Sequence, residues 1–97
     1  MARVKITPEA HFDLETIAEI IARDNLERAL SFTYELEEAC YELADHPERF
    51  ALLKGHETEK VRRRVFGNYL IIYRMNETDV DVLRIVNSVM DLNEVLG

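Results

Sequence analysis

Five arginines are the side chains of this sequence best suited to binding negative charge. Three are consecutive and two stand alone in apolar segments: Arg62, Arg63, Arg64, Arg74 and Arg84. On a strand, Arg62 and Arg64 would point to one face and Arg63 to the other. The run has two interpretations. It is either a basic face that binds an acidic partner, or a set of solvated charges that protects a sheet edge from aggregation.

Arg74 and Arg84 each need either an acidic partner or a solvent-exposed position at the rim of the sheet, because burying an unpaired charge is costly. The candidate partners are Asp81, Asp13 and the glutamates that follow residue 34. One interpretation is a structural ion pair. The other is contact with a binding partner or a target.

Other residue types that often carry chemistry do not form a recognisable catalytic or metal-binding pattern. Tyr69 and Tyr73 are two apart on an expected strand. They are therefore expected to pack in the core or in a partner's groove rather than act as acids. The three histidines lack metal-ligand spacing: His11, His46 and His56. The sequence contains no glycine-rich phosphate loop and no nucleophile motif, so we expect neither a metal nor a cofactor.

The first part of the chain predicts a strand followed by a helix. Residues 2–6 alternate charged and apolar side chains, which is typical of a short strand. Thr7 can cap a helix and Pro8 suits its first position. Apolar residues at helical spacing then form one stripe, and we expect the helix to end near Arg23: Ala10, Leu14, Ile17, Ala18 and Ile21.

A second helix is predicted directly afterwards, which makes a helical hairpin. Asp24 is the expected N-cap, with Glu27 as its reciprocal partner in a capping box. Cys40 lies within the apolar pattern of this helix and is expected to be a small core residue. The helix should end before Pro47, because a residue that precedes proline avoids the helical region.

Three strands are predicted in the second half of the chain, after an irregular connection at residues 48–59. They cover residues 61–66, 69–75 and 80–86. The order β-α-α-β-β-β indicates an α+β fold, with the helical hairpin packed on a small, mainly antiparallel sheet. The last two strands are apolar on both faces. The face away from the helices is therefore either covered by the edges of the helical layer and the C-terminal segment, or binds a protein partner or a second copy.

Composition indicates one globular domain, residues 1–97, with a net charge of −7. Residues 1–46 carry eleven acids and four bases, whereas residues 60–75 carry five bases and no acid. A strongly acidic total argues against non-specific nucleic-acid binding but allows a local basic patch. No apolar run is long enough to span a membrane, and one cysteine cannot form an internal disulfide, so a cytoplasmic protein is expected.

An ordered set of short stretches resembles the ParE/RelE toxin superfamily. The matching stretches, in chain order, are Thr7-Pro8-Glu9-Ala10, Asp13-Leu14, residues 21–25, Arg28-Ala29, Leu43-Ala44, Pro47, Val61-Arg62-Arg63, Gly67, Tyr69-Leu70-Ile71, Tyr73-Arg74, residues 83–86 and Asp91-Leu92. The resemblance implies a RelE-like fold. It also implies a type II toxin that arrests growth, and that a cognate ParD-like antitoxin neutralises by direct binding in a hetero-oligomeric complex. DNA would be contacted only through the antitoxin.

Two activities occur among such toxins: RelE-like members cleave messenger RNA in the ribosome, and ParE-like members inhibit DNA gyrase. The acidic net charge favours gyrase inhibition without enzymatic activity. So does the tail at residues 87–90, which lacks the tyrosine, histidine or arginine of RelE-like nucleases. Asn87 and Met90 also replace the histidine and arginine common in ParE. The alternatives are therefore a ribosome-dependent messenger-RNA endonuclease, or a detoxified module that still binds antitoxin.

The resemblance and the charge pattern together predict the residues that contact the antitoxin or the target. No catalytic residue is expected among them. They are Arg62, Arg63, Arg64, Arg74, Arg84, Tyr69, Tyr73, Asn87 and Met90.

Overall fold

A computed structural model of the chain describes residues 3–89 and contains two helices and four strands in this range. Their bounds are β1 Arg3–Ile6, α1 Pro8–Ala22, α2 Leu26–Tyr41, β2 Val61–Phe66, β3 Tyr69–Asn76 and β4 Asp79–Asn87. Two short 3-10 turns follow α2, at Glu42–Ala44 and Pro47–Arg49. The predicted order β-α-α-β-β-β is confirmed.

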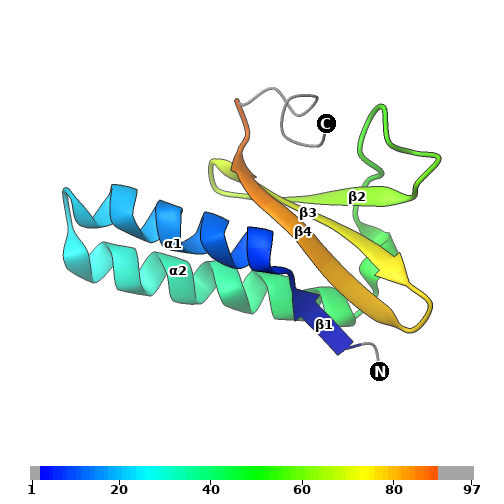
Figure 1. Ribbon diagram of the computed structural model, residues 1–97, viewed down its shortest axis with the longest axis horizontal. Coiled ribbons are helices and arrows are strands. Elements are labelled where there is room, and N and C mark those ends of the chain that lie inside the picture. Colours follow the sequence, from blue (N-terminus) through cyan, green and yellow to red (C-terminus); the bar gives the residue numbers. More distant parts are fainter. Residues whose placement is uncertain (1–2, 90–97) are drawn as a thin grey trace.

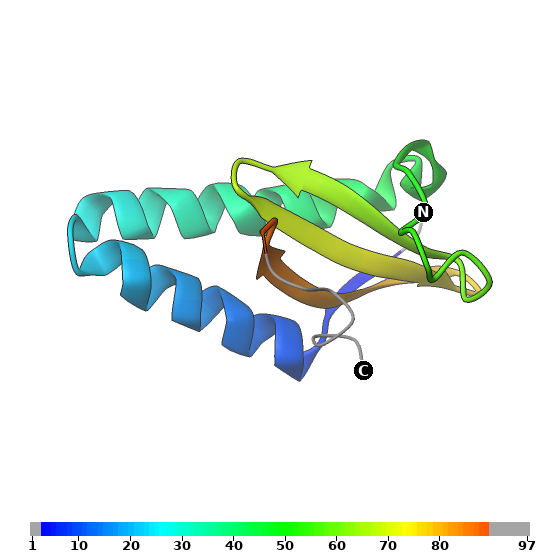
Figure 2. The same cartoon turned by 90° about the horizontal axis from the view of Figure 1, so that it is seen from above.

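The four strands form one sheet with the order β1-β4-β3-β2. β4 pairs antiparallel with β3, and β3 pairs antiparallel with β2, as expected for strands joined by tight turns. β1 pairs parallel with the first half of β4, with Val4 opposite Val80. The helical hairpin covers one face of this sheet, and its tip at residues 22–26 projects past the strands (Figures 1 and 2).

Thr7 joins β1 to α1 and bonds to both of the elements that it adjoins. Its hydroxyl accepts a hydrogen bond from the Ala10 amide at 3.2 Å, so it caps α1 as predicted, and Pro8 occupies the first turn. The same hydroxyl lies 2.8 Å from the Val82 carbonyl oxygen and 3.1 Å from that of Leu83. One residue therefore fixes the start of the helix against the edge of β4.

α2 begins one residue later than the sequence pattern predicts, so the prediction of Asp24 as its cap is wrong. The amides of Asp24 and Asn25 both donate to the Ile21 carbonyl, which keeps Asp24 in the turn that ends α1. Asn25 then adopts an extended conformation, and its side chain accepts from the Arg28 amide at 3.0 Å. With Asn25 as N-cap, Glu27 is not at the third helical position, and no capping box forms.

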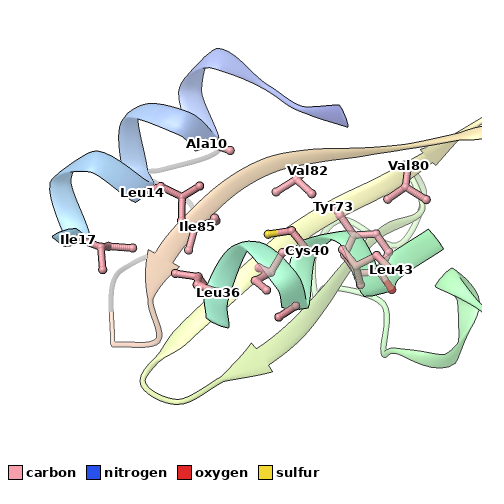
Figure 3. Packing of buried hydrophobic residues seen from close by; sticks show 12 residues of the cluster. Ala10, Leu14, Ile17, Leu36, Cys40, Leu43, Tyr73, Val80, Val82 and Ile85 are labelled. Carbon is pink, nitrogen blue, oxygen red and sulfur yellow. The ribbon is translucent and has the colours of Figure 1, made fainter. Parts of the chain in front are cut away.

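The main core lies between the helices and the sheet (Figure 3). α1 contributes Ala10, Leu14 and Ile17; α2 and the turn after it contribute Leu36, Ala39, Cys40 and Leu43; the sheet contributes Ile71, Tyr73, Val80, Val82 and Ile85. Cys40 is fully buried, as expected. Burial raises the pKa of its thiol to about 12, and nearby Glu37 adds to this shift.

A smaller cluster covers the sheet face that points away from the helices. Leu53, in the connection before β2, packs with Val61, Leu70, Ile72 and Val86, and each of these side chains is at most 7% exposed. The Leu53 amide donates to the Val61 carbonyl at 2.7 Å, which holds the connection on the sheet. The connection before β2 therefore covers the centre of this face, a cover that the strand pattern did not predict. The C-terminal segment, which was one expected cover, lies mostly outside the described residues.

None of the helices in residues 3–89 is both long enough and apolar enough to cross a membrane.

Candidate functional site: an apolar groove between α1 and β4

Arg62 and Arg64 share one face of β2, as the strand alternation predicts, and both are tied to this chain's own backbone. The Arg62 guanidinium donates to the carbonyls of Phe50 at 2.6 Å and Glu48 at 3.1 Å. Arg64 donates to the Ala39 carbonyl at 2.7 Å and to the Glu42 carboxylate at 2.9 Å. These hydrogen bonds hold α2 and the connection after it against β2.

Arg63 and Arg74 lie on the opposite face of the sheet. Arg63 stands opposite Ile72 in the strand pairing, and Arg74 stands opposite Asp81. Arg74 is exposed and Arg63 is half-buried. Within residues 3–89, neither guanidinium has an ion-pair or hydrogen-bond partner, so both can contact another molecule.

Asp13 and Arg84 form an ion pair between α1 and β4. The Nε and Nη2 atoms of Arg84 donate to the two carboxylate oxygens at 2.8 Å and 3.0 Å, a bidentate geometry. Asp13 also accepts the Ile85 amide at 2.8 Å. The hydrogen bonds that Arg84 donates to Asp13 raise the pKa of Arg84 above its usual value. The interpretation of Arg84 as part of a structural ion pair is confirmed, with Asp13 as the partner.

This ion pair forms the floor of a groove between α1 and the uncovered half of β4. The groove has a volume of about 390 Å³ and continues into a second hollow at the start of α1, which shares Phe12, Asp13 and Arg84 with it. Its other lining residues are Thr16, Ile17 and Ile20 from α1, Tyr69 from β3, and Ile85, Val86 and Asn87 from β4. The groove exists because β1 is short: it pairs only with residues 79–82 of β4, so none of the described strands lies beside residues 83–87 on the side away from β3.

Two large apolar side chains of the groove are solvent-exposed: Phe12 is 68% exposed and Ile20 is 49% exposed. Neither residue is among those that the charge pattern and the resemblance indicate. Both lie outside the stripe that packs in the core, with Thr16 between them, so they form a second row with a spacing of four residues. That second row is the signal that could have revealed the groove.

The structure brings together three of the nine residues predicted to bind the antitoxin or target. Tyr69, Arg84 and Asn87 line the groove. Tyr69 packs against Phe32, with 5.8 Å between ring centroids, and Asn87 accepts the Val89 amide at 3.0 Å. Met90 lies outside the described residues.

Tyr73 does not reach any surface, so its side chain cannot contact a partner in this fold. It is fully buried, and its hydroxyl donates to the Pro47 carbonyl. Burial raises the pKa of this hydroxyl to about 12. The inclusion of Tyr73 among the binding residues therefore needs correction. The residue packs under the turn at Pro47–Arg49 because β3 passes through the middle of the sheet.

The groove is suited to binding a peptide. It combines apolar side chains, one amide and an internally neutralised ion pair beside the part of β4 that β1 does not reach. Within residues 3–89, no three histidine, cysteine, aspartate or glutamate side chains converge into a possible metal site. The histidines lie in separate segments, and His56 is 3.6 Å from Glu59.

Comparisons with known proteins agree with this architecture. A chain from the solved structure of a chromosomal ParDE TA system from P. aeruginosa superposes with a TM-score of 0.74 at 21% sequence identity. The superposition covers 90% of this chain and 96% of that chain, so the two share a fold. None of the curated proteins matches the sequence significantly. Residues 4–92 match the family described as the ParE toxin of the type II toxin–antitoxin system parDE. Because this match spans nearly the whole chain, the protein belongs to the ParE toxin family.

Proposed function

We propose that this protein is the toxin of a type II pair, that it inhibits DNA gyrase by binding it, and that a ParD-like antitoxin neutralises it directly. The family match over residues 4–92 carries this proposal. The protein would act in the cytoplasm as a single domain in a hetero-oligomeric complex with the antitoxin. DNA would be contacted through the antitoxin, in keeping with the net charge of −7.

Binding, rather than catalysis, is the activity that the groove favours. Cleavage of RNA needs a general base and groups that stabilise charge around the scissile phosphate. Asp13 and Arg84 neutralise each other at the centre of the groove, and Asp13 also binds the Ile85 amide. These two ionisable side chains are therefore committed to structure.

The groove between α1 and β4 is the surface that we assign to the antitoxin. Phe12 and Ile20 expose apolar surface on one wall, and Tyr69 lies on the other side. Large exposed apolar side chains beside a preformed hollow are typical of peptide-binding sites. β1 does not reach the backbone of β4 after Ile85, and Asp13 accepts only the Ile85 amide. An extended segment could therefore pair with β4 at this point.

Two experiments test the proposed activity: expression of the gene without its antitoxin, and an assay with purified gyrase. Induction without antitoxin should arrest growth, and co-expression of the antitoxin should restore it. Purified protein should increase gyrase-dependent DNA cleavage complexes. Intact gyrase activity combined with new cut sites in cellular messenger RNA would instead establish the endonuclease alternative. Unimpaired growth with well-folded protein would establish a detoxified module.

Substitution of Phe12→Asp tests the groove as the antitoxin surface. Burying a carboxylate in an apolar contact should weaken antitoxin binding by roughly 10- to 100-fold. The matched control is Val65→Asp, because Val65 is 58% exposed on the far face of the sheet. Isothermal titration calorimetry with the purified antitoxin measures both affinities. An equal affinity for Phe12→Asp and the unsubstituted protein would remove the groove from the interface.

A further inference from the structure

The face of the sheet that points away from the helices, which we name the far face, carries more positive than negative charge. Alternation along the four strands places these charged side chains on it: Arg3, Lys5, Arg63, Arg74, Asp79 and Asp81. Four bases and two acids give the far face a formal charge of +2, whereas the whole chain carries −7. The acidic helices lie on the other side of the sheet (Figures 1 and 2), so the two sides of the molecule differ in charge.

Arg63 and Arg74 are neighbours on the far face. Arg63 in β2 stands opposite Ile72 in β3, and Arg74 lies two residues further along β3. Diagonal neighbours of this kind are about 7–8 Å apart. Within residues 3–89, neither guanidinium has an ion-pair or hydrogen-bond partner, although Asp81 stands opposite Arg74 in the pairing of β3 with β4. Two positive groups therefore lie close together without a bound negative charge.

Protection of a sheet edge does not account for these two arginines. β3, which carries Arg74, is an inner strand between β2 and β4. β2 is an edge strand, but its outer side is already paired at Arg63, because the Arg63 amide donates to the Ala51 carbonyl at 3.0 Å. Arg63 is also half-buried, and burying a charge without a partner is unfavourable. Both positions therefore fit a negatively charged binding partner.

We propose that Arg63 and Arg74 form the site that binds the toxin's target, and that this site takes an extended protein segment with acidic side chains at alternate positions. In an extended segment, residues two apart point to the same side and are about 6.6 Å apart, which matches the diagonal spacing of the two arginines. Each guanidinium can then hold one carboxylate through two parallel hydrogen bonds. The inference rests on the proposed function, in which the target is gyrase.

Carboxylates of a protein suit this site better than the phosphates of DNA. Proteins that bind duplex DNA through its backbone contact about 6–10 phosphates, and the net charge of −7 repels a long polyanion. Two guanidiniums on a face that also carries Asp79 and Asp81 match a short segment with few charges. The site is also separate from the groove, whose lining contains neither Arg63 nor Arg74.

Two synthetic peptides test the spacing on the full chain. Both consist of eight residues, six of them serine or threonine. The first has glutamates at its fourth and sixth positions, and the second has them at its fourth and fifth positions, where adjacent side chains point to opposite sides. Nuclear magnetic resonance of the arginine Nε–H groups measures each affinity and identifies the arginines that bind. A duplex of 12 base pairs serves as the nucleic-acid probe.

The first peptide should bind at least about threefold tighter than the second, because only the first places both carboxylates on the arginine pair. Arg63→Gln with Arg74→Gln should weaken its binding at least about tenfold. The matched control is Arg23→Gln with Arg49→Gln, which removes two exposed guanidiniums elsewhere and should leave the affinity within about twofold. The duplex should bind both double variants equally.

Gyrase then tests the same site on the proposed target. Arg63→Gln with Arg74→Gln should raise the concentration needed for half-maximal inhibition of purified gyrase at least about tenfold, whereas the control variant should stay within about twofold. Its affinity for the antitoxin should also stay within about twofold, which shows that the variant is folded. Circular dichroism provides a second check of the fold.

Five results would overturn the proposal. Equal affinity for the two peptides would remove the spacing argument, and peptide binding that ignores the Arg63 and Arg74 substitutions would remove the site. Duplex binding that these substitutions abolish would make DNA the occupant, and lost antitoxin affinity in a folded variant would assign the far face to the antitoxin. Unchanged gyrase inhibition by the variant would separate the site from the target. If the unsubstituted protein does not inhibit gyrase, the proposed function fails, and the peptide titration alone decides the acidic-segment site.

Discussion

Asp13 shows how one residue can satisfy several polar groups at a junction between elements. It lies in the apolar row of α1, and its side chain is 11% exposed. Its two oxygens accept from Arg84 Nε, Arg84 Nη2 and the Ile85 amide. The carboxylate thereby neutralises the half-buried guanidinium of Arg84. It also accepts a hydrogen bond from the Ile85 N–H, on the edge of β4 that β1 does not reach. Helix, sheet edge and groove floor depend on this residue together.

Asp13→Ala should therefore lower the free energy of unfolding by about 2–4 kcal/mol, because it removes a carboxylate that accepts two hydrogen bonds from a half-buried guanidinium and one from a backbone amide. Urea denaturation followed by circular dichroism measures the change. Asp79→Ala is the matched control, because it removes the Lys5–Asp79 pair at the surface, where Lys5 is 55% exposed, and should cost less than about 1 kcal/mol. Equal losses in the two variants would contradict the role given to Asp13.

The buried Cys40 thiol predicts a loss of stability at alkaline pH. In the folded protein its pKa is raised from 9.0 to about 12, so the folded thiol stays protonated where the unfolded thiol ionises. The stabilising contribution is complete below about pH 9 and is lost as the pH rises toward 12. Between about pH 8 and pH 10, this one group should lower the free energy of unfolding by about 1 kcal/mol.

Cys40→Ala should remove that part of the alkaline loss, since alanine does not titrate. Comparison of the two proteins at both pH values cancels the contributions of all other groups. The buried hydroxyl of Tyr73, with its pKa raised from 10.0 to about 12, should add to the loss above about pH 10 in both proteins. Parallel pH profiles for the two proteins would show that the Cys40 thiol titrates alike when folded and unfolded.

At the scale of elements, the junction between α1 and α2 depends on which residue leaves the helical conformation first. Asp24 and Asn25 are both good N-caps, and the local sequence favours Asp24 because Glu27 follows three residues later. The backbone instead places two successive amides on the Ile21 carbonyl, at 3.1 Å and 2.9 Å, and so delays the exit to Asn25.

Asn25→Ala should lower the free energy of unfolding by about 1 kcal/mol, because the Arg28 amide loses its acceptor. For a domain of this size, the melting temperature should fall by about 4–8 °C. Asp24→Ala is the matched control and should change the melting temperature by less than half as much. Differential scanning calorimetry distinguishes the two caps, and a larger drop for Asp24→Ala would restore the cap that the sequence favours.

β4 shows why strand alternation alone cannot assign every side chain to a face. A bulge lies between the pairs Ile72–Arg84 and Tyr73–Val82, so Leu83 is an extra residue in β4. The helix-facing residues of β4 are therefore Val80, Val82 and Ile85, a spacing of two followed by three. The bulge occurs where Thr7 and Asp13 replace β1 as the partners of β4, a contact between segments about 70 residues apart.

At the scale of the whole molecule, strand pairing joins the beginning of the described chain to its last strand. β1 comes first in the sequence and pairs in parallel with β4, the last strand that the structure describes. Val4 and Ile6 pack against the main core from β1. Such pairing closes a loop that includes both helices and β2 and β3, so its entropic cost is large and the packing of those elements must offset it.

Removal of residues 1–6 should therefore abolish most of the folded population at moderate temperature, since the domain is only marginally stable and would lose a strand and part of its core. Far-ultraviolet circular dichroism and urea titration measure the effect. Arg3→Ala with Lys5→Ala is the matched control. It keeps the strand and its two apolar side chains and should cost less than about 1 kcal/mol. A cooperative unfolding transition in the truncated protein, near that of the full chain, would contradict this role of β1.

The sequence by itself determined the types, order and most bounds of the elements, because periodicity and turn residues are local properties. It also predicted that Cys40 packs in the core and that the acidic charge lies in the helical half. Only the tertiary structure decided what each chemically capable side chain does. It committed Arg62, Arg64 and Tyr73 to internal contacts, paired Arg84 with Asp13, and opened a groove beside Phe12 and Ile20. These outcomes depend on β1 being shorter than β4 and on contacts between distant segments, which no local pattern specifies.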